Sequence, residues 1–196
     1  MVFAKLVKRG AKSGYTLVEV LVVVSIMGVL SAMGIAGLQR AVANARVKDA
    51  AINTAAFVER VANRASQLSA VLCLRVAPGN DQKLYVVRDD DDETCSSPKG
   101  GIVDSLVLDA PCKYISMATC GVVDVNWFSK SYSADKSFKP RVGLSATPPQ
   151  GGICIQYGSE DVFGAVLKER TVNRVKPMWK VGNDPMNGGW SSWTEL

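Results

Sequence analysis

One uninterrupted apolar stretch, residues 20–38 (VLVVVSIMGVLSAMGIAGL), constrains this chain more than any other feature. It contains no charged residue and no proline, and about 19 residues at roughly 1.5 Å each span about 30 Å, the thickness of a bilayer's hydrocarbon core. The stretch begins directly after Glu19 and exceeds the roughly 7 to 15 apolar residues of a signal peptide. A membrane-spanning helix is expected, and cleavage by signal peptidase at Gly34-Ile35-Ala36 is the competing interpretation.

The basic charge of the chain is concentrated before this stretch. The first fourteen residues carry no acid and four basic residues: Lys5, Lys8, Arg9 and Lys12. Removing these four from the 23 basic residues of the chain leaves 19 against 18 acidic residues. The formal net charge of +5 therefore describes a short basic leader, and nucleic acid is not an expected partner of the rest.

Helical character continues beyond the apolar stretch. Residues recur at alternating spacings of four and three in one stripe, in which Thr54 is the only polar member: Val47, Ala51, Thr54, Val58, Val61, Ala65, Leu68 and Leu72. No glycine or proline interrupts residues 38–77. A single helix from about Tyr15 to about Leu72 is predicted, apolar on all sides in its first half and amphipathic in its second.

The rest of the chain has the pattern of strands joined by turns. Clusters of proline and glycine at 78–80, 100–101, 148–149 and 151–152 separate short runs rich in β-branched residues. Strands are predicted at 84–88, 102–108, 123–127, 153–157 and 162–167, and a polar loop at 129–139. The expected fold class is α+β, with a long N-terminal helix whose C-terminal half is covered by an antiparallel sheet.

The residue types present argue against catalysis. The chain contains no histidine, which excludes His-type zinc sites, Ser-His-Asp chemistry and a cysteine nucleophile activated by imidazole. No phosphate-binding loop or metal-ligand spacing is recognisable either. No catalytic residue, metal or cofactor is therefore expected.

Five cysteines follow the apolar stretch: Cys73, Cys95, Cys112, Cys120 and Cys154. None has the C-x-x-C spacing of a metal or redox site, and export of this part would favour disulfides. Five thiols leave one unpaired and allow fifteen arrangements of two bridges. We expect Cys73 to pair with Cys95 and Cys112 with Cys120, while Cys154 stays a small buried residue inside a strand.

The junction of leader and helix reads Lys12-Ser13-Gly14-Tyr15-Thr16-Leu17-Val18-Glu19-Val20-Leu21. A basic leader ending in glycine, an aromatic residue, Thr-Leu and an acid four residues past the aromatic resembles the type III signal of type IV pilins and type II secretion pseudopilins. The resemblance is specific over residues 9–38 and rests on architecture elsewhere. It implies that prepilin peptidase cuts between Gly14 and Tyr15 and methylates the Tyr15 amine, with Lys12, Thr16 and Leu17 in the same signal.

One departure from the family pattern lies within the apolar stretch. Many family members have a proline some twenty residues into the mature helix, where this chain has Ile35-Ala36-Gly37. Gly34 and Gly37 are the residues that would soften the helix there instead.

Two features of the apolar helix predict assembly. An acid at the centre of a bilayer costs on the order of 2.5–3.5 kcal/mol, and Glu19 would lie one turn from the Tyr15 amine after cleavage, where the two charges can pair. Gly28, Ala32 and Ala36 recur every four residues and offer a narrow face for close packing of another helix.

These features divide the chain into four segments. Residues 1–14 are the expected leader, 15–38 the transmembrane half of the helix, 39–72 its amphipathic half, and 73–196 a β-rich head. The precursor is expected to cross the inner membrane once with its N-terminus in the cytoplasm. The mature subunit would then enter a periplasmic or cell-surface filament.

The expected function is mechanical: a structural subunit of a type IV pilus-like filament. The expected partners are other pilin subunits, prepilin peptidase, the inner-membrane assembly platform and the lipid bilayer. A pseudopilin that drives protein export by type II secretion is the alternative within the family. A membrane-anchored glycan- or DNA-binding module that never polymerises is the alternative of another class.

Other candidate sites are weaker. Contiguous acids at 89–93, and Asn183, Asp184 and Asn187, lack the spacing of a calcium loop. Three tryptophans, Trp179, Trp190 and Trp193, either stack on a glycan or pin the tail to the sheet. A basic bias of the helix, from Arg40, Arg46, Lys48, Arg60 and Arg64, lacks the interleaved aromatics of a DNA-binding surface.

Overall fold

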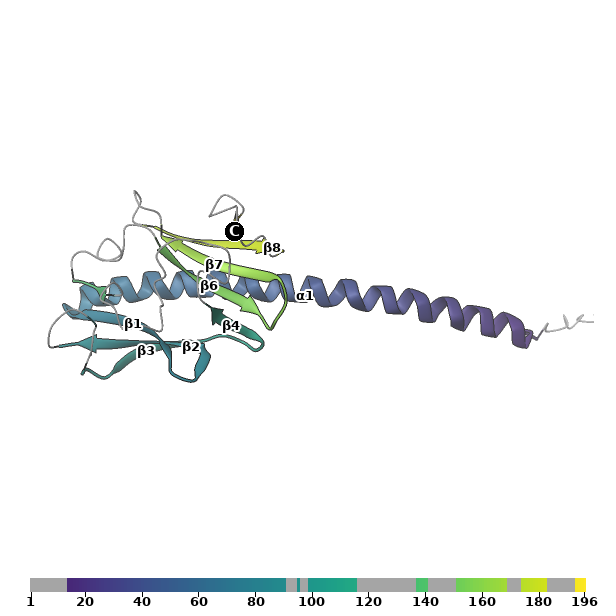
Figure 1. Cartoon of the computed structure of the whole chain (residues 1–196), viewed down its shortest axis with the longest axis horizontal. Coiled ribbons are helices and arrows are strands. Elements are labelled where there is room, and N and C mark those ends of the chain that lie inside the picture. The colour runs from purple at the N-terminus through teal and green to yellow at the C-terminus, as the bar shows by residue number, and fades with distance from the viewer. Residues whose placement is uncertain are drawn as a thin grey trace, which may run out of the picture. The chain divides into compact units, whose positions relative to one another are not determined.

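The computed structural model describes residues 14–90, 95, 99–115, 137–140, 151–168, 174–182 and 193–196. The described elements are α1 (Leu17–Leu68), β1 (Val71–Ala77), β2 (Asn80–Asp89), β3 (Ile102–Val107), β4 (Cys112–Ile115), β5 (Ser137–Phe138), β6 (Gly151–Tyr157), β7 (Val162–Lys168), β8 (Val175–Val181) and β9 (Thr194–Glu195) (Figure 1). The chain divides into two compact units, Met1–Ala41 and Val42–Leu196.

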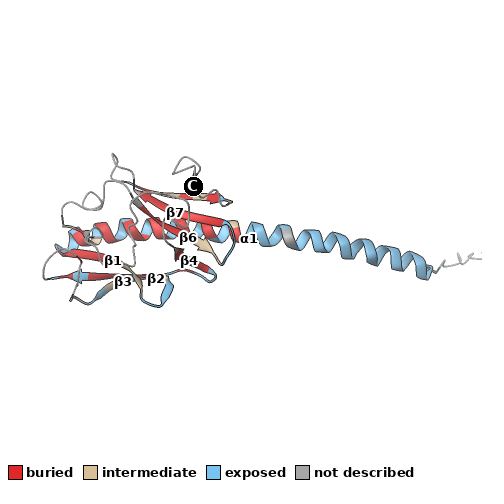
Figure 2. Ribbon diagram, viewed as in Figure 1, coloured by how far each residue is buried: buried red, intermediate tan, exposed pale blue. Residues whose placement is uncertain are grey.

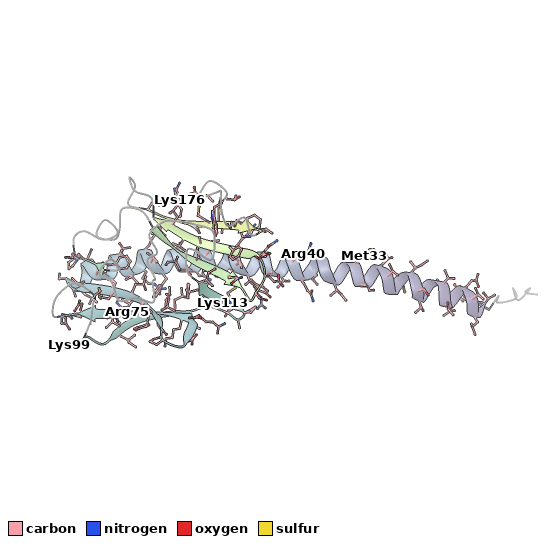
Figure 3. The ribbon with its side chains drawn as sticks, viewed as in Figure 1. Met33, Arg40, Arg75, Lys99, Lys113 and Lys176 are labelled. Atoms are coloured by element: carbon pink, nitrogen blue, oxygen red, sulfur yellow. A yellow bond between two sulfur atoms is a disulfide. The ribbon has the colours of Figure 1, made fainter. Side chains whose placement is uncertain are left out.

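In the first unit, α1 is an apolar helix, and no other described part of the chain packs against it. Every side chain described between Gly14 and Ala41 is exposed (Figure 2). Met33 is 71% exposed, and it projects from the helix as Arg40 does (Figure 3). Burying a large apolar side chain is worth about 1.5–3 kcal/mol, so a helix of this kind favours an apolar surrounding. By length and composition, α1 is able to cross a membrane.

In the second unit, the predicted stripe is the buried face of α1. The residues from Val47 to Ala65 in that stripe are buried, whereas Leu68 is 42% exposed. The helix ends at Leu68, four residues before the predicted end, because Ser69 adopts a left-handed φ of 47°. The amide of Ala70 donates to the Ala65 carbonyl at 3.2 Å, which closes a Schellman-type C-cap.

The head contains two antiparallel sheets where one was predicted. Sheet A has the order β3-β2-β1-β5, and sheet B has the order β4-β6-β7-β8-β9. In Figure 1, β1, β2 and β3 lie on one side of this part of α1, β7 and β8 lie on the other, and β6 crosses the helix in this view. The α+β class, with a long apolar N-terminal helix and antiparallel sheets, is confirmed.

The individual strand predictions had mixed outcomes. The runs predicted at 84–88, 102–108, 153–157 and 162–167 correspond to β2, β3, β6 and β7. The sequence patterns did not predict β1, β4 and β8. The strand expected at 123–127 lies outside the described residues, as does 129–136 of the expected loop. The prediction of a loop over the whole of 129–139 was wrong at Ser137–Phe138, which pairs with β1 as β5.

The core of the head joins α1 to both sheets. Its members include Val58 and Val61 of the helix, Leu72 of sheet A and Ile155 of sheet B. Sheet B is also covered on its other face, where a second cluster contains Cys154, Phe163, Ala165, Leu167, Met178 and Trp193. Strand β6 is therefore buried on both faces.

The cysteine predictions were right for one pair and wrong for the other. Cys73 and Cys95 form a disulfide. Cys112 is a buried free thiol, because it lies on the helix-facing side of β4 inside the main core. Cys154 is disulfide-bonded, not an unpaired buried residue, because the face of β6 that carries it turns away from the helix. The remaining cysteine of the sequence, Cys120, lies outside the described residues.

Candidate functional site

The first turn of α1 contains a reciprocal capping arrangement. Gly14, Tyr15 and Thr16 precede the helix, which begins at Leu17. The Thr16 amide donates to the Glu19 carboxylate at 2.9 Å, and the Thr16 hydroxyl donates to the same oxygen at 3.0 Å. The Glu19 amide in turn donates to Thr16 Oγ1 at 3.2 Å. Thr16 is therefore the N-cap of the helix, and Glu19 completes a capping box.

This arrangement gives Glu19 a local role that the sequence reading missed. The signal was present as Thr16-Leu17-Val18-Glu19, which has the T-x-x-E spacing of a capping box. The expected pair between Glu19 and the Tyr15 amine belongs to the cleaved chain. In the uncleaved chain the Tyr15 nitrogen is part of a peptide bond, so that pair stays a prediction.

Glu19 is also the only acid in a long segment of the helix. No other acid occurs between Gly14 and Lys48, and no residue between Val20 and Gln39 is charged. The carboxylate lies at the end of the helix where backbone N–H groups carry partial positive charge, which favours an acid. The capping bonds engage only one of its two carboxylate oxygens, which leaves the other able to accept a hydrogen bond from a cation.

The expected helix-packing face is open where the structure describes it. Gly28 and Ala32 are exposed, and a Cβ built on Gly28 would meet no atom within 4 Å. The nearby Ser25 hydroxyl donates to the Leu21 carbonyl at 2.8 Å, which satisfies it within the helix. The side chain of Ala36, and all of Lys12, lie outside the described residues.

A cavity of about 80 Å³ lies between α1 and the β3–β4 connection. Its lining includes Arg46, Asp49, Asp109 and Cys112. Burial raises the pKa of the Cys112 thiol, Asp109 adds to the effect, and Arg46 opposes it. The thiol is thus held in its protonated form at neutral pH, which is the unreactive form.

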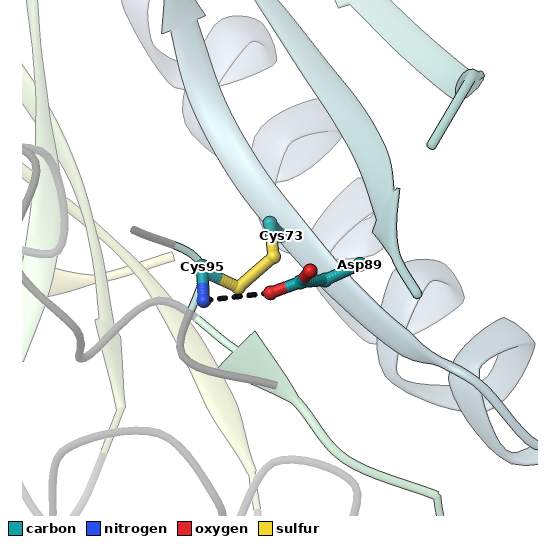
Figure 4. A group of neighbouring side chains, drawn as sticks. All are labelled: Cys73, Asp89 and Cys95. Atoms are coloured by element: carbon teal, nitrogen blue, oxygen red, sulfur yellow. Dashed lines mark hydrogen bonds between the residues drawn. A yellow bond between two sulfur atoms is a disulfide. The ribbon is translucent and has the colours of Figure 1, made fainter. Parts of the chain in front are cut away.

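Cys73, Asp89 and Cys95 place three ligand-type atoms within 4.8 Å of one another on the outer face of sheet A (Figure 4). The two sulfur atoms are bonded to each other. The Asp89 carboxylate accepts the Cys95 amide at 2.9 Å, and Cys95 adopts a left-handed φ of 58°. The disulfide and this hydrogen bond therefore hold Cys95 against β1 and β2.

The other candidate residues take part in packing and pairing of the head. Asp89 is buried and Asp90 pairs with Arg88, whereas 91–94 lie outside the described residues, as do Asn183, Asp184, Asn187 and Trp190. Trp193 is buried against sheet B, as expected of a residue that pins the tail.

The basic residues of α1 in the head have partners there too. The Lys48 ammonium lies 4.1 Å from the centre of the Trp179 ring. Arg46 donates to the Ala110 carbonyl at 2.8 Å. Asp104 lies within 4.0 Å of Arg60 and 3.6 Å of Arg64. These contacts indicate a structural use for the basic bias of the helix.

Comparison with known proteins gives one match, at the N-terminal end. A model of the prokaryotic N-terminal methylation motif matches residues 9–35, which include the capped first turn and most of the apolar stretch. No curated protein and no solved structure matches the chain. Through this motif at the start of a long apolar helix, the chain carries the signature of the type IV pilin and pseudopilin family.

Proposed function

We propose that this chain is a structural subunit of a type IV pilus-like filament, cleaved between Gly14 and Tyr15 and assembled through the first half of α1. The observation that carries the proposal is Glu19, a lone acid at the start of a helix segment that is otherwise uncharged from Val20 to Gln39. Capping Thr16 needs only a side-chain acceptor, which glutamine would supply as well, whereas the charge of an acid costs free energy in a bilayer and therefore calls for a partner.

Cleavage would convert this acid into half of a charge pair. Removal of residues 1–14 creates an amine on Tyr15, four residues before Glu19 and next to Thr16, whose amide already donates to the Glu19 carboxylate. Within a bundle of apolar helices the effective dielectric constant is low, so an unpaired charge is strongly disfavoured and a matched pair is tolerated. The pair can form within one subunit or between neighbours.

The exposed apolar side chains in the first half of α1 would hold neighbouring subunits together in a filament. In the membrane they are solvated by lipid, and in a filament the helices of neighbouring subunits take the place of lipid. Gly28 and Ala32 would let two helices approach closely at this step. The proposed partners are other pilin subunits, prepilin peptidase and an inner-membrane assembly platform, and the proposed route runs from the inner membrane to a periplasmic or surface filament.

Two substitutions of Glu19 test the proposal. Glu19→Ala removes the charge and the two hydrogen bonds that the carboxylate accepts from Thr16, whereas Glu19→Gln removes the charge and keeps an acceptor for Thr16. Each variant is expressed with the native assembly machinery, and its amount is compared between the membrane fraction and sheared filaments. Both should insert and end up cleaved after Gly14, yet be missing from filaments.

The expected loss of incorporation into filaments can be calculated from the cost of an unmatched buried charge. Leaving one member of a buried charge pair unmatched costs about 3–5 kcal/mol, which reduces incorporation by a factor of about a hundred or more. Incorporation of Glu19→Gln at the wild-type level would show that the charge is not needed and would remove the basis of the proposal. Long filaments from the wild type would identify a pilus, and loss of enzyme export in a deletion strain would identify a pseudopilus.

A further inference from the structure

We infer that Thr16 is a positioning residue for the processing step: by capping α1, it keeps the Gly14–Tyr15 peptide bond outside the helix, where a peptidase can bind it in extended form. The inference rests on the proposed cleavage between these two residues. It gives the threonine a role of its own, separate from the charge of Glu19 and from assembly.

The backbone of the described N-terminal turn shows where the helix stops. The first helical hydrogen bond runs from the Val20 amide to the Thr16 carbonyl, at 3.3 Å. Gly14 and Tyr15 lie before this bond, have no helical assignment and are exposed. Two residues, Tyr15 and Thr16, therefore separate the scissile bond from the first helical residue, Leu17.

Hydrolysis at this bond requires an accessible carbonyl. The oxygen of a water molecule bonds to the Gly14 carbonyl carbon, the C–N bond breaks, and a proton moves to the Tyr15 nitrogen. The carbonyl oxygen must meet hydrogen-bond donors of the enzyme as negative charge develops on it. Inside a helix the same oxygen would accept the N–H four residues further on, and the neighbouring turn would shield the carbon.

Three hydrogen bonds between Thr16 and Glu19 oppose extension of the helix toward the scissile bond. The Thr16 hydroxyl accepts the Glu19 amide, and the Glu19 carboxylate holds the Thr16 amide and hydroxyl. The next residue toward the N-terminus whose side chain can accept a capping hydrogen bond is Ser13. A helix capped there would include both Gly14 and Tyr15 in its first turn.

The test is the rate at which full-length precursor is converted to mature protein in membranes that contain the peptidase. Thr16→Val keeps the shape of the side chain but removes the hydroxyl, and Thr16→Ser keeps the hydroxyl. We expect Thr16→Val to be cleaved about fivefold more slowly, the equivalent of the roughly 1 kcal/mol of an N-cap, and Thr16→Ser at the wild-type rate.

Two further measurements separate positioning from direct recognition of the hydroxyl. Glu19→Ala removes the two capping bonds that the carboxylate accepts and keeps the one that the Thr16 hydroxyl accepts, so it should slow cleavage about twofold. Cleavage should still reach completion. Amide hydrogen exchange on the uncleaved Thr16→Val chain should show protection extending from Val20 back to Val18, whose amide would donate to the Gly14 carbonyl in a longer helix. Slow cleavage of Thr16→Val without either effect would mean that the enzyme reads the hydroxyl itself, which would overturn the inference.

The outcomes also distinguish this inference from the proposed function. If the wild-type precursor is not cleaved after Gly14, the proposed function fails first. If the wild type is cleaved there and Thr16→Val is cleaved equally fast, only the role given to Thr16 is lost.

Discussion

At Gly164 sheet B approaches the helix closely, and adding one methyl group there should loosen the head. The residue lies in β7, opposite Ile155 of β6 and Trp179 of β8. A Cβ at this position would lie 2.8 Å from Val47 Cγ1, 3.0 Å from the Val47 carbonyl oxygen and 3.3 Å from Ala51 Cβ. Gly164→Ala therefore forces the strand and the helix apart.

The expected loss of stability depends on which atoms of α1 must move to make room for the added methyl group. Overpacking a well-packed core typically costs about 1–3 kcal/mol. The upper part of that range applies, because one neighbour is a backbone oxygen and the Val47 side chain is fully buried. For a unit of this size, about 2–3 kcal/mol corresponds to a fall in Tm of roughly 4–12 °C.

Thermal unfolding of the full chain in detergent micelles, followed by tryptophan fluorescence, measures this change. Gly101→Ala is the matched control, because its Cβ would meet nothing within 4 Å, and its stability should change by less than about 0.5 kcal/mol. Adding Val47→Ala to Gly164→Ala should give a smaller loss than the sum of the two single changes. A Tm of Gly164→Ala within a degree of the wild type would refute the close packing of β7 on α1.

Two further predictions concern the head. Burial raises the pKa of Tyr114, whose hydroxyl shares a 3.2 Å hydrogen bond with Thr54. At this phenol the unfolded chain therefore ionises first, so the contribution of Tyr114 to stability should be constant below about pH 10 and fall above it by up to about 1.4 kcal/mol per pH unit. In denaturant titrations between about pH 8 and 11, Tyr114→Phe should lose this part of the decline, and an unchanged slope would contradict the burial of the phenol. Replacing Cys73 and Cys95 by alanine removes a disulfide that closes a loop with a sequence separation of 22, and it should lower the free energy of unfolding by roughly 3 kcal/mol. Non-reducing peptide mapping of the wild type should find Cys112 unbridged.

The sequence predicted the helix well because its pattern is strong over a long distance. The helix begins at Leu17, two residues after the expected start at about Tyr15, and the predicted end lay four residues too far along, since Val71 and Leu72 continue the apolar spacing of the stripe although they belong to β1. The helix ends at the left-handed conformation of Ser69, which the sequence does not predict because this conformation is uncommon for serine. The same ambiguity concealed β1, because a short apolar run after a helix fits either element.

The second sheet and the cysteine pairs depend on information that a single strand pattern does not contain. Alternation in β6 suggested one buried face and one exposed face, but both faces are covered. The pattern could therefore not tell that Cys154 points away from the helix and Cys112 toward it. Cys73 and Cys95 were easier, because β1 and β2 pair through a short turn and Cys95 follows the end of β2 closely in the sequence.

The N-terminal signal was the most predictable part, and its position makes it the easiest to test. The buried clusters of the head consist of residues from Ala43 onward, so the side chains of Thr16 and Glu19 contribute nothing to them. Substitutions at these two residues should therefore leave the unfolding transition of the head unchanged. A defect in cleavage or in filament entry can then be read as a defect of that step. The converse holds for Gly164→Ala, which weakens the head but leaves the capped turn and the apolar helix intact.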